Sequence, residues 1–354
     1  AWQRPGVAES LLDPHRLEAL TRTAQRGLFD FVWLGDSFDP PAPDGPQVPF
    51  RLDALLSLAR VAPNTSDIGL VATVSTTHTE PFHVSKNLAT LDLVSAGRGA
   101  WHVAVSTSDE AARRFGRKGP QSLPSLWAEA EDAIEVVTRL WDSWEDDAVI
   151  RDASTGRYLD REKVHSIDFE GPFFSVRGPS ITPRSPQGQP PIVIIADGDA
   201  ASAVAARRAD IIVIDADDAG RAHRRRAELR DAVAAAGRDA NDVAILVRAR
   251  VSTVDERAAL DAATTAQAPS VVLDVVGDAE FVAATLQQWW STESADGFVL
   301  LPDALPSTLD WLVDDVVPRL QQLDVFRGQY RPGTLRGRFG LDRPANRYAA
   351  AVAS

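Results

Sequence analysis

The chain has 354 residues, of which 44% are hydrophobic and 25% are charged, and its formal net charge is -13. This composition is typical of a globular protein with a sizeable core, and the acidic balance disfavours non-specific binding to nucleic acid or to an anionic membrane. No apolar run approaches the length of a membrane span and no signal peptide is visible, so we expect a cytoplasmic protein.

Cysteine and methionine are both absent from the sequence. Without cysteine, disulfides, thiolate catalysis and cysteine metal sites are excluded, and we predict no metal site. The absence of methionine is unusual for this length. It leads us to expect that residues are missing, before Ala1 or elsewhere.

The first half of the chain alternates apolar strands with helices. We expect helices over residues 15–26, 51–61 and 81–95, and strands over residues 28–34, 68–74 and 100–105. Pro81 suits the first turn of its helix. The alternation predicts a parallel α/β architecture.

The strand over residues 100–105 divides its side chains between two faces. Trp101 and Val103 point to one face, and His102 points to the other, which also carries Ser106. In a barrel the bulky face would lie under helices and the other would look into a ligand site. The alternative is a buried strand with one histidine bonded to backbone.

The second half resumes the alternation after a long interruption. Apolar residues at helical spacing predict a helix over residues 126–144. Residues 146–189 lack periodicity, and we interpret them as an insertion that leaves the core. Strands are expected over residues 192–196, 210–214, 243–251 and 297–301, and helices over residues 200–208, 219–236, 278–290 and 307–323.

These patterns give seven strands, whereas a (β/α)₈ TIM barrel needs eight. We predict one barrel domain over residues 1–354 with its first strand missing before Ala1; an open doubly wound sheet is the alternative. The tail, residues 324–354, is rich in arginine. We expect it to pack across the barrel surface or a partner subunit, with an anion site less favoured.

Polar residues follow several predicted strands, where barrel enzymes carry their sites. They are Asp36, Thr76, Thr77, Thr79, His102, Ser106 and Asp197-Gly198-Asp199. Asp36 and Thr79 could instead cap helices. Motifs for a phosphate-binding loop, a serine hydrolase and a zincin are absent. A hydrolase using Asp36 and Asp197 stays a minor alternative.

Six stretches carry a family pattern: FDFVWLGDSF (29–38), VATVSTTHTEPFH (71–83), LDLVSAGRGAWHVAVS (91–106), residues 139–179, PRSPQGQPPIV (183–193) and RPANRY (343–348). In this order they resemble the bacterial luciferase-like superfamily. The likeness is to its two-component flavin-dependent monooxygenases, related to nitrilotriacetate and dibenzothiophene-sulfone monooxygenases.

The resemblance implies a barrel that holds reduced FMN at the carboxyl ends of its strands. A separate flavin reductase would supply the flavin, and O₂ would serve to oxygenate a small organic substrate. An apolar pocket, lined by groups such as Trp33 or Phe38, would exclude water. The resemblance also favours a dimer or tetramer.

The resemblance implies that Asp36, Thr76, Thr77 and His102 stand at family positions that touch flavin. At the position of His102 the family usually has Asn. We take His102 as the catalytic candidate.

Two departures from the family pattern concern the flavin site. Leu123 and Trp127 stand where the family usually has His and Tyr. Asp197-Gly198-Asp199 replaces the Gly-Ser-Ser that holds the FMN phosphate at a helix N-terminus. Each carboxylate would repel the phosphate by roughly 1 kcal/mol in water, which the helix dipole, about 0.3–1 kcal/mol, would not offset.

Three hypotheses follow. The first, which we favour, is a working monooxygenase whose flavin phosphate is held elsewhere or whose flavin is used transiently. The second is a family member with weak or no FMN binding that acts as a binding or assembly protein, for example with an active paralogue. The third is an enzyme that uses a different flavin or a deazaflavin.

Overall fold

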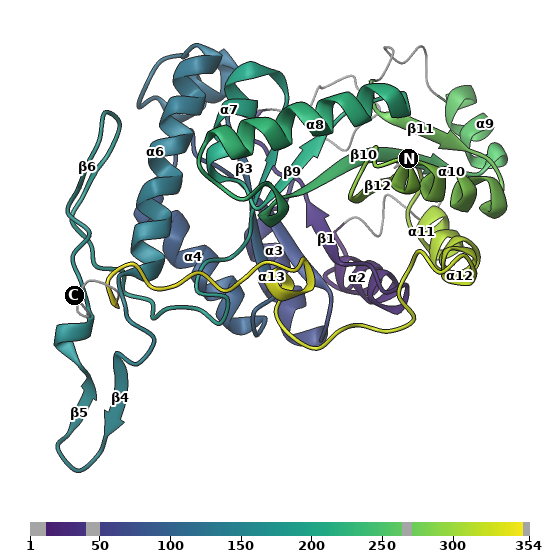
Figure 1. Ribbon diagram of the computed structural model, residues 1–354. Coiled ribbons are helices and arrows are strands. Elements are labelled where there is room, and N and C mark those ends of the chain that lie inside the picture. The colour runs from purple at the N-terminus through teal and green to yellow at the C-terminus, as the bar shows by residue number, and fades with distance from the viewer. Residues whose placement is uncertain (1–11, 40–49, 264–270, 350–354) are drawn as a thin grey trace. The chain divides into compact units, whose positions relative to one another are not determined.

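The computed structural model describes residues 12–39, 50–263 and 271–349 (Figure 1). The chain divides into two compact units. The β2–β3 unit comprises the described parts of residues 33–40, 52–192 and 332–354. The β8–β12 unit comprises those of residues 1–32, 41–51 and 193–331.

The β2–β3 unit is built on parallel strands followed by helices. Its strands are β2 (Gly69–Ser75) and β3 (Gly99–Ala104), with β1 (Phe31–Leu34), which spans the boundary between the units, beside β2. Its helices are α3 (Ala54–Val61), the 3-10 turn η1 (Ala62–Asn64), α4 (Pro81–Val94), α5 (Asp109–Phe115) and α6 (Leu123–Asp142). The β2–β3 register pairs Leu70 with Gly99 and Ser75 with Ala104, so both strands end at the same edge.

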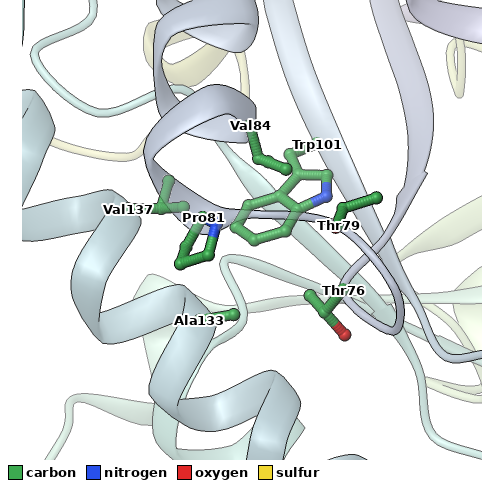
Figure 2. Close-up of a pocket in the computed structure, with 7 residues that line it drawn as sticks. All are labelled: Thr76, Thr79, Pro81, Val84, Trp101, Ala133 and Val137. Atoms are coloured by element: carbon green, nitrogen blue, oxygen red, sulfur yellow. The ribbon is translucent and has the colours of Figure 1, made fainter. Parts of the chain in front are cut away.

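The two faces of β3 carry the side chains that the sequence predicts. Trp101 is fully buried, and its Nε1 donates a hydrogen bond to the Val74 carbonyl at 3.1 Å. Figure 2 shows its ring between α4 and α6, beside Pro81 and Val137. His102 lies on the opposite face. Truncation of a buried tryptophan costs about 3–5 kcal/mol, so Trp101 anchors these helices to the sheet.

The insertion consists of two small antiparallel hairpins outside the parallel sheet. They are β4 (Val149–Asp152) with β5 (Arg157–Leu159), then the 3-10 turn η2 (Arg161–Lys163), and β6 (Phe169–Glu170) with β7 (Ser175–Val176). Within this unit they extend from α6 away from β2 and β3 (Figure 1). The hairpins were not predicted, and part of the predicted insertion over residues 146–189 is buried, including Ile167, Phe169, Arg184 and Gln187. The insertion as a whole stays a prediction.

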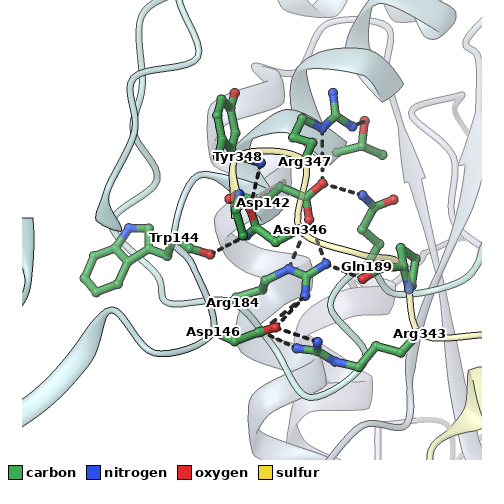
Figure 3. A network of polar contacts seen from close by, with 12 residues as sticks. Asp142, Trp144, Asp146, Arg184, Gln189, Arg343, Asn346, Arg347 and Tyr348 are labelled. Atoms are coloured by element: carbon green, nitrogen blue, oxygen red, sulfur yellow. Dashed lines mark hydrogen bonds and ion pairs between the residues drawn. The ribbon is translucent and has the colours of Figure 1, made fainter. Parts of the chain in front are cut away.

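The C-terminal tail packs on this unit through a network of ion pairs (Figure 3). The Arg184 side chain is 1% exposed and meets Asp142, also 1% exposed, at 3.0 Å. Arg343 pairs with Asp146, and Arg347 pairs with Asp142 at 3.1 Å. The short helix α13 (Leu335–Arg338) precedes these residues. This part of the tail therefore has the packing role that the sequence predicts.

The β8–β12 unit is a parallel sheet with helices between its strands. Its strands are β8 (Ile192–Ile195), β9 (Ile211–Ile214), β10 (Ala244–Ser252), β11 (Leu273–Val276) and β12 (Gly297–Pro302). Its helices are α2 (Arg16–Arg26), α7 (Gly198–Arg208), α8 (Ala219–Ala235), the 3-10 turn η3 (Ala240–Asp242), α9 (Val254–Ala263), α10 (Ala279–Ser291), α11 (Ser307–Trp311), the π turn η4 (Leu312–Val316) and α12 (Val317–Gln322). The last three occupy the single helix predicted over residues 307–323.

Strand β10 is the centre of this sheet. It pairs with β9 through residues 244–247, with β12 through residues 246–251, and with β11 through residues 249–252. All seven predicted strands are present, and β11 adds an eighth that was not predicted. The expected strand before Ala1 stays a prediction.

Among the described residues, no helix is both long and apolar enough to cross a membrane. The same part of the chain holds no group of three or more metal-ligating side chains.

Candidate functional site

Loops after β1, β2 and β3 meet through one group of side chains in the β2–β3 unit. This strand-end cluster consists of Phe38, Thr77, His78, Ser106 and Phe115. The Phe115 ring stacks on His78 at a centroid distance of 4.8 Å and meets Phe38 edge-on at 4.7 Å. The cluster therefore combines an aromatic wall with three polar side chains.

Both threonines predicted at the site are buried and bonded. The Thr76 hydroxyl donates to the Ala104 carbonyl at 3.2 Å, and the Thr77 Oγ1 accepts from the Ser106 N–H at 3.0 Å. These bonds tie the end of β2 to the end of β3. Thr79 does not cap α4, whose N-cap is Glu80.

Two buried polar atoms of the cluster have no hydrogen-bond partner. Among the described residues six such side-chain atoms occur, and they include His78 Nδ1 and Ser106 Oγ. Of the other four, three belong to arginines or to an aspartate paired with arginine, and the fourth, the Ser185 hydroxyl, lies beside the Asp92 carboxylate. His78 and Ser106 thus retain unused bonding capacity at one edge of the sheet.

His102, the catalytic candidate from the sequence, is engaged within the protein. Its Nδ1 lies 3.0 Å from the Thr73 hydroxyl, which also accepts a hydrogen bond from Trp33 Nε1 at 2.9 Å. The Trp33 and His102 rings meet at 4.4 Å. His102 is therefore buried and bonded, as the structural alternative expects, although the partner in this contact is a side chain.

Asp36 bonds to the start of a helix. Its Oδ2 accepts from the N–H of Ala54, the first residue of α3, at 3.1 Å, and its Oδ1 accepts from Ser37 N–H at 2.7 Å. Such bonds satisfy amides that the helix itself leaves unpaired. This geometry accords with the capping alternative, and a contact with flavin stays a prediction.

The start of α6 lacks the polar side chains that the family pattern would place there. Leu123 is 43% exposed at the first residue of the helix, and Trp127 is buried four residues later. The neighbouring polar group is Glu129, 3% exposed, which pairs with Lys118 and accepts from Gln121 Nε2 at 3.1 Å. This carboxylate was not predicted from the sequence.

Asp197, Gly198 and Asp199 lie in the β8–β12 unit at the start of α7, and all three are exposed. The Asp197 side chain does not cap the helix. Gly198 has a φ of +80°, and a Cβ added there would meet nothing within 4 Å. The backbone at this helix start is therefore open to a ligand, with two carboxylates beside it.

Charged residues on β10 were also missed by the sequence analysis. Arg248 forms a two-pronged ion pair with Asp215, and Arg250 lies 3.6 Å from Asp303. Arg257 contacts Asp303 at 2.7 Å and also pairs with Asp274. Arg248 and Arg250 could have been found from the sequence, because residues two positions apart lie on one face of a strand.

The pocket in Figure 2 does not offer acid–base groups. It is lined by Thr76, Thr79 and five apolar residues on β3, α4 and α6. A flavin ring needs a flat apolar wall and hydrogen-bonding groups for its amide-like edge. The strand-end cluster holds groups of both kinds: the Phe115 ring, on which His78 stacks, and the buried His78 Nδ1 and Ser106 Oγ.

The chain is similar to known monooxygenases. Residues 2–309 match the luciferase-like monooxygenase family. The chain is 31% identical to N-acetyl-S-(2-succino)cysteine monooxygenase of Bacillus subtilis, over 99% of this chain and 95% of that protein. It is 29% identical to nitrilotriacetate monooxygenase component A of Aminobacter aminovorans, over 98% and 94% of the two chains.

The fold is also that of a solved relative. EDTA monooxygenase from Chelativorans sp. BNC1 superposes with a TM-score of 0.82 at 26% identity, covering 97% of this chain and 95% of that one. The predicted TIM-barrel class is confirmed in place of an open doubly wound sheet. The chain belongs to the luciferase-like monooxygenase family of flavin-dependent oxidoreductases.

Proposed function

We propose that the protein is the oxygenase component of a two-component monooxygenase. It would bind reduced FMN delivered by a separate flavin reductase and use O₂ to oxygenate a small organic substrate. The observation that carries this proposal is the strand-end cluster, where two buried polar atoms without partners lie beside an aromatic wall in a chain of this family. We further propose a cytoplasmic homo-oligomer.

Bound reduced flavin would supply the electrons that activate O₂. The side chains of the cluster would bind and orient the ring, and Phe38 and Phe115 would keep water from it. Asp36, Thr76, Thr77 and Trp127 stay predicted flavin contacts, and His102 stays the predicted catalytic residue. That Gly198 and Asp199 at the start of α7 contact the cofactor stays a separate prediction, and the carboxylates there would repel a phosphate.

A second candidate function rests on the departures from the family pattern. Leu123 and Trp127 are apolar, and two exposed carboxylates flank Gly198. A chain that has lost flavin affinity would act as a binding or assembly protein, for example with an active paralogue. An enzyme that uses another flavin or a deazaflavin would differ in its ligand preference.

An anaerobic titration separates these candidates. Purified protein is titrated with reduced FMN, oxidised FMN and riboflavin while tryptophan fluorescence is followed. Micromolar binding of reduced FMN is the expected result, because oxygenases of this type receive their flavin already reduced. Absence of binding by any flavin, in folded protein, would overturn the proposal and favour the binding or assembly role.

A further inference from the structure

His78 occupies a strained position directly after β2. Its φ is 68°, in the left-handed region that residues other than glycine seldom adopt. Such a conformation costs of order 1–3 kcal/mol and persists where the surrounding contacts impose it. Here the preceding residue, Thr77, is buried and bonded to Ser106. The positive φ, held by these contacts, therefore sets the direction of the His78 side chain.

The imidazole is held by stacking and has no hydrogen bond. Its plane lies 9° from that of Phe115. Its Nδ1 is buried without a partner, and so is the hydroxyl of Ser106, a residue that is 7% exposed. Because Ser106 donates its N–H to Thr77, the residue before His78, both unsatisfied atoms belong to one junction of β2 and β3. A buried polar atom without a partner costs about 1–3 kcal/mol, which a ligand that bonds to it would recover.

Charges around His78 favour its neutral form. Burial lowers the pKa of His78, Lys118 lowers it further, and Glu129 opposes them. Lys118 and Glu129 pair with each other, and the nearby Glu80 pairs with Arg117 at 3.3 Å. A neutral imidazole has one nitrogen that donates and one that accepts, so it can bond to either an N–H or a carbonyl.

His102 differs from His78 on each of these points. Its Nδ1 is bonded to Thr73, and its ring lies against Trp33. The family resemblance favours His102 as the ligand-binding histidine because of its place in the motif. The geometry favours His78, because its Nδ1 has no hydrogen-bond partner.

We propose that His78 is the histidine that bonds to the bound ligand, with the Ser106 hydroxyl as the second contact. The ligand presents an amide-like edge of N–H and C=O groups on a planar ring, as a flavin does. This inference rests on the proposed function. It predicts that the imidazole of His78, and not that of His102, forms a hydrogen bond with the ligand.

Imidazole ¹⁵N chemical shifts of the whole protein test the proposal without relying on turnover. The chain has six histidines, and the variants His78→Gln and His102→Asn assign the two signals that matter. We expect anaerobic addition of reduced FMN to shift the His78 Nδ1 signal more than any signal of His102. We also expect His78→Gln to weaken binding about 5- to 10-fold, as for one lost hydrogen bond, and His102→Asn to weaken it less than 3-fold.

The outcomes are distinguishable. If reduced FMN binds and the His78 signal does not move, the inference about His78 is wrong while the proposed function stands. If no flavin binds to the folded wild-type protein, the proposed function fails and this inference with it. Should His78→Gln fold poorly, His78→Asn serves instead, since asparagine tolerates a positive φ better than most residues; unchanged affinity in a folded variant would overturn the inference.

Discussion

Two polar clusters of the β2–β3 unit differ in whether their buried polar groups have hydrogen-bond partners. In the tail network, Arg184 meets Asp142 and Asp146, and the Asn346 amide donates to the Asp142 carbonyl at 2.8 Å. In the strand-end cluster, His78 and Ser106 are held in place yet have no hydrogen-bond partner for their side chains.

The difference separates structural groups from groups available to a ligand. A buried charge is tolerated only when it is paired, and the tail network meets this condition around Asp142. An unsatisfied buried atom lowers stability, so each one in a native protein has a cause such as an ordered water, an ion, strain, or a catalytic or binding role. The tail network therefore holds the fold, and we propose that a ligand completes the strand-end cluster.

Arg184→Met should give the largest change in stability. It leaves the buried Asp142 without one of its cationic partners, and breaking a buried ion pair costs about 3–5 kcal/mol. Urea denaturation measures the loss. Arg177→Met, which removes an exposed arginine of the same insertion, is the matched control and should change the free energy of unfolding by less than about 0.5 kcal/mol. Equal effects of the two substitutions would contradict the structural role of the network.

Asp197→Gly with Asp199→Ser should tighten FMN binding about 3- to 10-fold, because two carboxylates beside the phosphate are removed. Riboflavin lacks the phosphate and is the control ligand, whose affinity should not change. Fluorescence titration compares the two. An unchanged FMN affinity would refute the placement of the phosphate at α7.

Acid should weaken the tail network in a defined range of pH. Arg343 and Arg184 lower the pKa of Asp146 from 3.8 to about 2. A carboxylate with a depressed folded-state pKa stabilises the protein above its unfolded pKa and loses that contribution as pH falls from about 4 to about 2. Since Asp146 is half exposed, we expect a loss of roughly 1 kcal/mol after allowing for solvent screening. Asp146→Asn should flatten stability over this range; an unaltered slope would show that other groups cause it.

The smallest effect is expected from His102→Asn. Asparagine can keep the bond to Thr73 while losing the ring contact with Trp33, so the free energy of unfolding should fall by about 1 kcal/mol or less. Thermal denaturation checks this value. A much larger loss would contradict this expectation and show that the packing of His102 is important for stability.

Much of the fold was predictable from local patterns. Pro81 begins α4, and the alternation around Trp101 assigned its two faces correctly. The short α5 was missed because it lacks an apolar repeat, although Ser108 as N-cap and Gly116 after its end were available signals. The strand β11 was also missed: Asp274 interrupts its apolar run, whereas β8 and β9, which are equally short, are wholly apolar.

The site was less predictable than the fold. His78 lies in a motif of small polar residues, and nothing in its local sequence reports a positive φ or an unpartnered nitrogen. These properties arise from Phe115 and Ser106, which are distant in sequence. The pairing of Arg184 with Asp142 likewise depends on residues 42 positions apart.

Hydrogen–deuterium exchange with and without reduced FMN, under anaerobic conditions, tests the central claim most directly. The account predicts slower exchange in peptides that cover residues 75–79 and 104–108, and no change in peptides that cover residues 142–147 and 343–347. Flavin-dependent protection confined to the tail network, or bound flavin without protection at the strand ends, would contradict it.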